Sequence, residues 1–307
     1  MSRRKKGNPV HGWVVLDKPL NMTSTQAVGA VRRAFNAQKA GHAGTLDPLA
    51  TGILPIALGE ATKTVPYAVD GEKAYRFAVR WGAETTTDDA EGAVTKSSDI
   101  RPTRAAIEAL LPKFHGEIQQ VAPQFSAIKI AGERAYDLAR AGEDVALQAR
   151  TVVIERFALV DQPDDATSVF EAECGKGTYV RALARDMGRM FGCYGHVIAL
   201  RRTRVGSFDE ARAVTMEALQ AAAQNEDPDA ALAKLIEPVE AALCDLPELV
   251  ISQSDAASLT QGKAILIRGR DAPIHSGQAF ATSKGRLIAL GEFDKGALHP
   301  TRVFNLG

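Results

Sequence analysis

Apolar and polar positions along the 307-residue chain follow several different periods, and each period predicts an element. Between Lys73 and Trp81, large apolar residues alternate with small or basic ones, which predicts a strand with one buried face. The run Gly12–Leu16 is apolar throughout and stops at Asp17, as a strand does before a turn. After Ser24 the apolar residues return at helical spacing, which predicts a helix that Ser24 could cap.

Further elements follow in no regular order of strand and helix. Strands are predicted at Phe125–Ile130, Thr151–Val160, Ser168–Cys174 and His196–Phe208, and helices at Thr103–Phe114, Glu133–Ala141 and Tyr179–Phe191. Because the strands and helices do not alternate, the pattern favours an α+β domain around a mostly antiparallel, mixed sheet. We assign this domain to residues 12–245.

The character of the sequence changes after Pro247, where short apolar runs are separated by Gly, Asp and Lys. This change predicts a small β-rich domain over residues 246–307, which is small enough to need docking on the larger one. Residues 1–11 include four consecutive basic side chains and no apolar segment, and they predict a flexible basic arm.

The charge distribution is more informative than the net charge, which is zero, with 37 basic and 37 acidic residues. Residues 1–80 carry 12 Lys and Arg against 5 Asp and Glu. Residues 181–212 and 261–307 each carry 7 against 3. If folding brings these blocks together, they would form a surface that binds phosphates. A solvated surface with no ligand explains the same pattern equally well.

Several classes of protein are disfavoured by composition. No apolar run approaches the roughly 20 residues of a membrane helix, and the basic start lacks the apolar core of a signal peptide. The 3 cysteines and 6 histidines show no metal-ligand spacing. We therefore expect buried, reduced thiols in a cytoplasmic protein with no membrane segment and no bound metal.

The segment Gly41–Gly52 is the most unusual part of the chain, because it combines three glycines with His42, Asp47 and Pro48. Glycines let the backbone approach another chain closely, and Pro48 disfavours a helical conformation at Asp47. The segment therefore predicts an irregular loop that presents one carboxylate and one imidazole. An ordinary Asp-Pro turn is the alternative. A P-loop is excluded, because the order of glycine, lysine and hydroxyl residues is absent.

Two basic clusters follow later in the chain. Lys176–Arg181 lies where a predicted strand meets a helix, so Arg181 could pair with a carboxylate and hold it charged and oriented. In the second cluster, strand alternation would send Arg201 to one face, and Leu200, Arg202 and Arg204 to the other. A phosphate contact and a plain solvated face both fit the second cluster.

Taken together, these segments resemble the TruB family of tRNA pseudouridine synthases over nearly the whole chain. The matching stretches are GWVVLDKPLNMTS (12–24), GHAGTLDPLATGILP (41–55), FSAIKIAGERAYDLARAG (125–142), GKGTYVRALARDMG (175–188) and HVIALRRTRVGSF (196–208). Residues 246–307 resemble the PUA domain common at the C-terminus of this family. The chain departs from the family at Asn21, usually glycine, and at Ala131, usually polar. Asn tolerates the left-handed conformation of the expected turn.

The resemblance implies that the protein isomerises uridine 55 in the T-loop of tRNA to pseudouridine, with no cofactor or metal. Asp47 would be the catalytic aspartate at the glycosidic bond. Arg181 would form its salt bridge. Tyr75 would stack on the target base, although the strand pattern alone also fits a core aromatic residue.

Substrate contacts are implied in the same way. His42 would fill the space left by the flipped uridine, while Tyr179 and Leu200 would line the uracil pocket. Residues 124–150 resemble the RNA-gripping insertion of the family. Further substrate contacts, mainly to phosphates, would come from Lys129, Arg134, Arg140, Arg150 and Arg202.

The implied partner is tRNA, read by the shape of its T-loop and T-stem, with the acceptor stem contacted through the C-terminal domain. A monomer would suffice. Two alternatives stay open: a pseudouridine synthase for another RNA, and a tRNA-binding or tRNA-folding protein in which catalysis is secondary. A base-exchange enzyme is disfavoured, because such enzymes commonly carry a zinc site.

Overall fold

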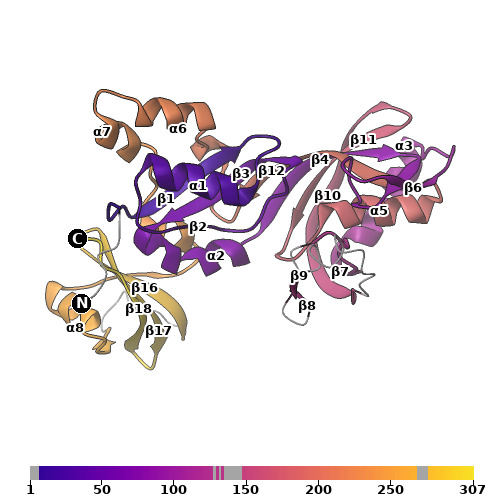
Figure 1. The fold of residues 1–307 in the computed structure, drawn as a ribbon. Helices are drawn as coiled ribbons and strands as arrows, with labels where there is room; N and C mark the ends of the chain where they lie inside the picture. The colour runs from indigo at the N-terminus through magenta and orange to yellow at the C-terminus, as the bar shows by residue number, and fades with distance from the viewer. Residues whose placement is uncertain (1–6, 127–128, 131–132, 135–146, 268–275) are drawn as a thin grey trace.

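A nine-stranded sheet runs through the molecule and collects strands from distant parts of the chain (Figure 1). The computed structural model describes residues 7–126, 129–130, 133–134, 147–267 and 276–307. Along the sheet the order is β1-β3-β12-β4-β11-β10-β7, with β2 paired to β3 and β13 to β12. Its strands are β1 (Gly12–Lys18), β2 (Ala40–His42), β3 (Ala50–Leu58), β4 (Lys73–Trp81), β7 (Gly116–Gln120), β10 (Arg150–Asp164), β11 (Thr167–Cys174), β12 (Gly195–Val205) and β13 (Phe208–Asp209).

The helices are short and lie beside this sheet. They are α1 (Ser24–Ala34), α2 (Val65–Asp70), α3 (Arg104–Leu110), α5 (Val180–Phe191), α6 (Met216–Ala223) and α7 (Pro228–Ala233), with 3-10 turns η1 (Gly59–Lys63), η2 (Leu111–Phe114), η3 (Glu210–Arg212) and η4 (Val239–Leu243). Two small hairpins complete this part: β5 (Ala83–Thr85) with β6 (Val94–Ser97), and β8 (Lys129–Ile130) with β9 (Glu133–Arg134). In the described chain no helix is long and apolar enough to cross a membrane.

The pairing confirms the predicted α+β class. Strands β3 and β12 run parallel, with Leu200 opposite Ala50, whereas the other pairs described in this sheet are antiparallel. Helix α1 packs against β1 and β3, and α5 packs against β4 and β12 (Figure 1). Different helices therefore cover the two ends of the sheet. The parallel pairing of β3 with β12 joins these two ends.

Burial differs between the two halves of the sheet and explains two different sequence patterns. In β1, Trp13 and Val15 enter one core cluster while Val14 and Leu16 enter another, so both faces are buried. In β4, Phe77 is buried beneath α5 and its neighbour Arg76 is exposed. A strand buried on both faces is continuously apolar, and a strand buried on one face alternates.

The C-terminal residues form a separate five-stranded sheet, in agreement with the predicted β-rich unit. It contains β14 (Glu248–Val250), β15 (Ile265–Leu266), β16 (Gly277–Ser283), β17 (Arg286–Asp294) and β18 (Ala297–Val303), with α8 (Gln253–Thr260) packed on it. Phe280 and Phe304 pack in the same apolar cluster as Trp13 and Phe208 of the larger sheet. The unit is therefore docked through a shared core.

Several local predictions need correction. Thr23, not Ser24, caps α1, because the buried Ser24 hydroxyl bonds to the backbone of Leu46 instead. Residues 133–134 form a strand where we expected a helix, and the remainder of that expected helix, 135–141, lies outside the described residues. In the expected strand 125–130, Lys129–Ile130 forms a hairpin strand, Phe125 and Ser126 do not, and residues 127–128 are outside the described part. Strand β3 was not among our predictions.

The expected N-terminal arm, residues 1–11, is described only from Gly7 onward. Residues 1–6 lie outside the described part of the chain. From Gly7 onward the backbone is anchored, since Asn8 N donates to Asn36 O at 2.6 Å and His11 Nδ1 accepts from Glu60 N at 3.2 Å. The expectation of a free arm through residue 11 is therefore wrong for its last five positions, Gly7–His11.

Candidate active site

The loop between β2 and β3 presents Asp47 and is fixed from several sides. Gly44 has φ +94°, a conformation that L side chains rarely adopt. Leu46 N and O bond to Ser24 Oγ at 2.8 and 2.9 Å. Pro48 O accepts from Asn21 N at 2.8 Å, and Asn21 itself has φ 62°. The left-handed turn expected at Asn21 is therefore confirmed, and it supports the loop directly.

Asp47 and Arg181 form the ion pair that the sequence predicted. Arg181 Nη2 lies 3.0 Å from Asp47 Oδ2. The Arg181 side chain is 7% exposed, whereas that of Asp47 is 39% exposed. The pair thus has a buried cationic side, supplied by α5, and a carboxylate that remains open to solvent and to a substrate.

Arg181 also holds a second carboxylate that the sequence analysis missed. Its Nη1 lies 3.3 Å from Asp89 Oδ2 and donates to Thr87 O at 2.8 Å, and Nη2 donates to Phe125 O at 3.0 Å. The guanidinium is thereby fixed by several acceptors at once, which its planar fork permits. The run of threonines and aspartates at 85–89 indicates a turn but does not show which residue the turn contacts.

Tyr75 lies opposite Arg202 across β4 and β12. Burial raises the pKa of the Tyr75 hydroxyl, while the Arg202 charge opposes that rise. Arg202 is 2% exposed and donates to Ile53 O at 2.8 Å, and to Thr45 O and Gly44 O at 3.2 Å each. The expected substrate contact of Arg202 does not fit this position, because its guanidinium donates to the backbone of β3 and of the loop that carries Asp47.

His42 stands at the end of β2, beside the same loop. Its Nδ1 is buried and has no hydrogen-bond partner among the described residues. Burial lowers the pKa of the imidazole, and the nearby Arg202 charge lowers it further. The lowered pKa favours the neutral form of the His42 imidazole, at the start of the loop that carries Asp47.

Tyr179 caps the start of α5 and is held through its backbone by Gln120. Tyr179 N donates to Gln120 Oε1 at 2.8 Å, and Gln120 Nε2 donates to Tyr179 O at 3.2 Å. Burial raises the pKa of the Tyr179 hydroxyl. Leu200 packs against both core clusters that flank β12. Tyr179 is thus two residues from Arg181, and Leu200 lies at the junction of the two halves.

The expected phosphate contacts are only partly described. Arg150 is exposed at the start of β10, opposite Gln120. Lys129 and Arg134 are backbone register partners in the β8–β9 hairpin. Arg140 lies outside the described residues.

The basic residues at the end of β12 mostly meet carboxylates. Arg201 Nη2 pairs with Asp17 Oδ2 at 2.9 Å, and Arg204 Nη2 pairs with Glu173 Oε2 at 2.6 Å. A register shift between Arg202 and Arg204 interrupts the alternation that we expected, so Arg204 does not share the buried environment of Arg202. This cluster therefore adds little free positive charge.

Lys18 is a buried cation that supports the turn beside the Asp47 loop. Its Nζ donates to Pro19 O at 2.9 Å and to Met22 O at 2.7 Å. Burial lowers the pKa of Lys18 to about 8, and the charge of Asp47 opposes that shift. Lys18 thus orders the turn whose Asn21 holds Pro48.

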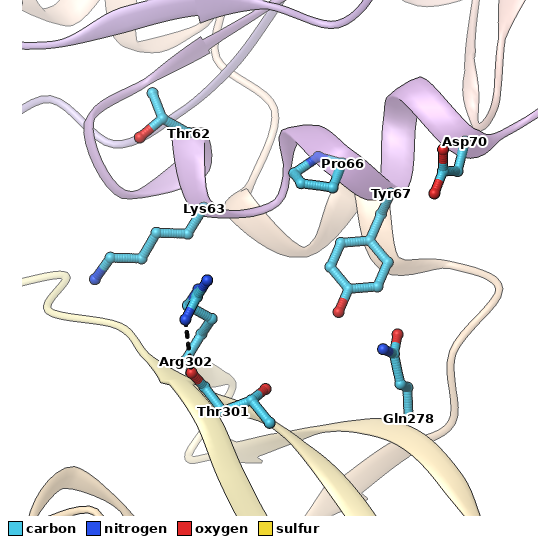
Figure 2. A pocket seen from close by; sticks show the side chains of 8 residues that line it. All are labelled: Thr62, Lys63, Pro66, Tyr67, Asp70, Gln278, Thr301 and Arg302. Carbon is cyan, nitrogen blue, oxygen red and sulfur yellow. Dashed lines mark hydrogen bonds between the residues drawn. The ribbon is translucent and has the colours of Figure 1, made fainter. Parts of the chain in front are cut away.

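A concave region lies between α2 and the C-terminal sheet (Figure 2). This hollow of about 610 Å³ is lined by Thr62, Lys63, Pro66, Tyr67, Asp70, Gln278, Thr301 and Arg302. The Tyr67 hydroxyl points toward Gln278, while Arg302 rises from β18 toward Lys63 (Figure 2). Asp70 Oδ1 also lies 2.9 Å from Lys176 Nζ, in the turn that leads to Tyr179. One wall of the hollow therefore contacts the turn that precedes Tyr179.

An open carboxylate, a buried arginine partner and a nearby phenol define an enzyme site suited to reaction at a glycosidic carbon. Residues 32–180 match the model of the TruB family pseudouridylate synthase N-terminal domain. Residues 181–244 match that of the tRNA pseudouridylate synthase B C-terminal domain. The chain belongs to the TruB family of pseudouridine synthases.

Curated relatives and solved structures agree with this assignment. The tRNA pseudouridine synthase B of Bradyrhizobium diazoefficiens is 59% identical over 99% of this chain and 91% of its own length. That of Agrobacterium fabrum is 56% identical over 98% of this chain and 97% of its own. A chain in the crystal structure of a Cbf5-Nop10-Gar1 complex superposes with a TM-score of 0.73 at 26% identity, covering 96% of this chain and 84% of that one.

Proposed function

We propose that this protein converts uridine 55 in the T-loop of tRNA to pseudouridine, with Asp47 as the reacting carboxylate. The observation that carries the proposal is the Asp47–Arg181 pair, at 3.0 Å, in which the carboxylate stays 39% exposed while the arginine is buried. The names of its relatives support the substrate class, since they are tRNA pseudouridine synthases that match the chain nearly end to end.

The reaction needs one bond broken and one formed. The N1–C1′ bond of the flipped uridine breaks, the uracil rotates, and C5 then bonds to C1′. The proton leaves C5 and N1 gains one, so the product is an isomer and no group is transferred. Asp47 would stabilise the positive charge that develops at the sugar or bond to it covalently. Tyr75, which burial keeps protonated because its pKa is raised, would relay the proton.

Extruding the uridine from the T-loop costs a few kcal/mol of lost stacking. The neutral ring of His42 lies beside the loop, where it would occupy the vacated space. Arg150, exposed at the edge of the site, would contact a phosphate. Every side chain in this proposal comes from one chain, so a monomer in the cytoplasm would be competent.

The acceptor arm of the tRNA would reach the hollow between α2 and the PUA-like C-terminal unit. Arg302 is exposed there and pairs with no carboxylate among the described residues. Tyr67 adds an aromatic ring and Gln278 an amide (Figure 2). A cation beside an aromatic ring suits RNA backbone and base contacts.

The test is conversion of an unmodified tRNA transcript by purified protein in the presence of a metal chelator. We expect pseudouridine at position 55 alone, and we expect Asp47→Asn to abolish turnover while changing tRNA affinity less than about threefold, since a neutral isostere removes only the nucleophile. Asp99→Asn, at an exposed aspartate outside the site, serves as the control. Comparable turnover by Asp47→Asn would refute the assignment of the carboxylate. Modification at another position would indicate a different RNA specificity.

A further inference from the structure

Helix α5 carries three arginines at intervals of four residues, all facing the segment 84–89. The pairs are Arg181–Asp89 (3.3 Å), Arg185–Asp88 (3.0 Å) and Arg189–Glu84 (2.6 Å). Residues four apart share one face of a helix. The segment is therefore held to α5 by successive ion pairs, of which the first also reaches Asp47.

The middle pair is also buried, and each of the three guanidinium nitrogens of Arg185 has a partner. The side chains of Arg185 and Asp88 are 7% and 9% exposed. Arg185 Nη2 also donates to Val121 O at 2.7 Å, and Nε donates to Asp186 Oδ1 at 2.9 Å. A buried pair of this kind contributes little net stability but fixes geometry, because displacing either partner leaves a charge without compensation.

Asp88 has φ 60°, an unusual conformation for a residue other than glycine. The turn is anchored on one side by Val197 N, which donates to Asp88 O at 3.1 Å. On the other side it is anchored by the Arg185 guanidinium. The next residue, Asp89, holds Arg181. A shift of the Asp88 side chain would therefore move the Asp89 carboxylate, and with it the guanidinium that pairs with Asp47.

We propose that Asp88 and Arg185 form a positioning pair for the reaction: their contact sets the place of Asp89, and Asp89 sets the place of Arg181 relative to Asp47. Neither residue touches the substrate in this arrangement. The inference rests on the proposed uridine isomerisation at the Asp47 site. It adds that the reaction depends on a charge pair one turn along α5 from Arg181.

The charged state of Asp88 makes the pair sensitive to pH. Burial raises the pKa of the Asp88 carboxyl to about 6, and the charges of Arg185, Arg181 and Arg189 on α5 oppose the rise. Asp89 on its own segment and Asp186 beside Arg185 are the neighbouring acids, and β12 meets Asp88 through the Val197 peptide. Protonation of Asp88 weakens the pair, so the rate falls as the pH drops through about 6.

The test compares single-turnover rates on an unmodified tRNA transcript at saturating enzyme between pH 5.5 and 8. Asp88→Asn keeps the shape and tolerates the left-handed conformation. It is expected to lower the rate at pH 7.5 about tenfold, because small displacements at a reacting group are costly. The tRNA dissociation constant is expected to stay within about twofold. The fall in rate that the wild-type protein shows as the pH drops through about 6 should be absent from this variant. Arg104→Gln, in the exposed pair with Glu108 on α3, is the matched control with the wild-type rate and profile.

A second variant separates positioning from stability. Combining Asp88→Asn with Arg185→Gln removes both buried charges, which is often neutral for stability. We expect this double variant to melt near the wild-type temperature and still react slowly. A wild-type rate or an unchanged pH profile in either variant would overturn the proposal. If neither variant folded, the pair would serve stability alone, and the proposal would again be overturned. If the wild-type protein itself left uridine 55 unmodified, the proposed function would fail instead.

Discussion

Tyr75 and Arg202 lie opposite each other across β4 and β12, although we propose a base contact for the first and the second is buried against the loop that carries Asp47. Arg202, on β12, donates to Ile53 O at 2.8 Å, and therefore joins the strand that follows the loop to the neighbour of β4, which carries the phenol. Burial raises the pKa of Tyr75, and the Arg202 charge limits the rise. The phenol thus keeps its proton at neutral pH while it lies next to a fixed cation.

Tyr75→Phe tests whether this hydroxyl takes part in the reaction. The substitution keeps the ring for stacking and removes only the proton carrier, so we expect single-turnover conversion to fall about 100-fold, the usual range for one acid–base group. Affinity for tRNA should be unchanged in a filter-binding measurement. Tyr194→Phe, whose ring lies 5.5 Å from Lys96 Nζ at another site, is the control. A wild-type rate in Tyr75→Phe would show that the hydroxyl takes no part and that only the aromatic ring is needed.

Gly52→Ala tests how tightly the loop is built. Gly52 has φ +100°, and an added Cβ would lie 2.2 Å from the Arg202 carbonyl oxygen. We expect the free energy of unfolding to fall by on the order of 3 kcal/mol, because backbone strain and a backbone clash act together. Urea unfolding measures this change. Gly41→Ala is the comparison, since a Cβ there meets nothing within 4 Å. Equal stability of the two variants would contradict the expectation.

Arg302→Gln tests the hollow beneath α2. If Arg302 neutralises one phosphate of the acceptor arm, binding of full-length tRNA should weaken a few-fold, and the dependence of log K on log salt should lose roughly one unit of slope. Conversion of an isolated T-arm hairpin should not change. Arg286→Gln, at an exposed arginine of β17 that does not line this hollow, provides the control. Identical salt slopes for the wild-type protein and Arg302→Gln would exclude the contact.

Elements with strong local signals could be predicted from the sequence. The Thr103 hydroxyl caps α3 by accepting from Ala106 N at 3.2 Å, and the alternation in Lys73–Trp81 matches β4 closely. Both signals act within a few residues. Strand β3 was missed because it is buried on both faces, so its apolar run lacks a period, and it begins inside the glycine-rich segment.

The site was recognised only in part for a related reason. The Asp47–Arg181 pair could be predicted because the motifs around both residues resemble one family. Asp89 was overlooked, since nothing near it in the sequence shows that the turn folds back onto α5. Arg202 was expected at the substrate, because an arginine in a basic run is usually exposed.

The amino-acid sequence by itself determined the periods of the elements, the glycine-built loop around Asp47 and the family to which the chain belongs. These features depend on neighbouring residues or on the order of residue types. Only the tertiary structure decided which charges are buried, which carboxylates share Arg181 and where Arg202 points. Burial and ion pairing depend on segments that are distant in the chain, and their energies arise only when packing removes water from between them.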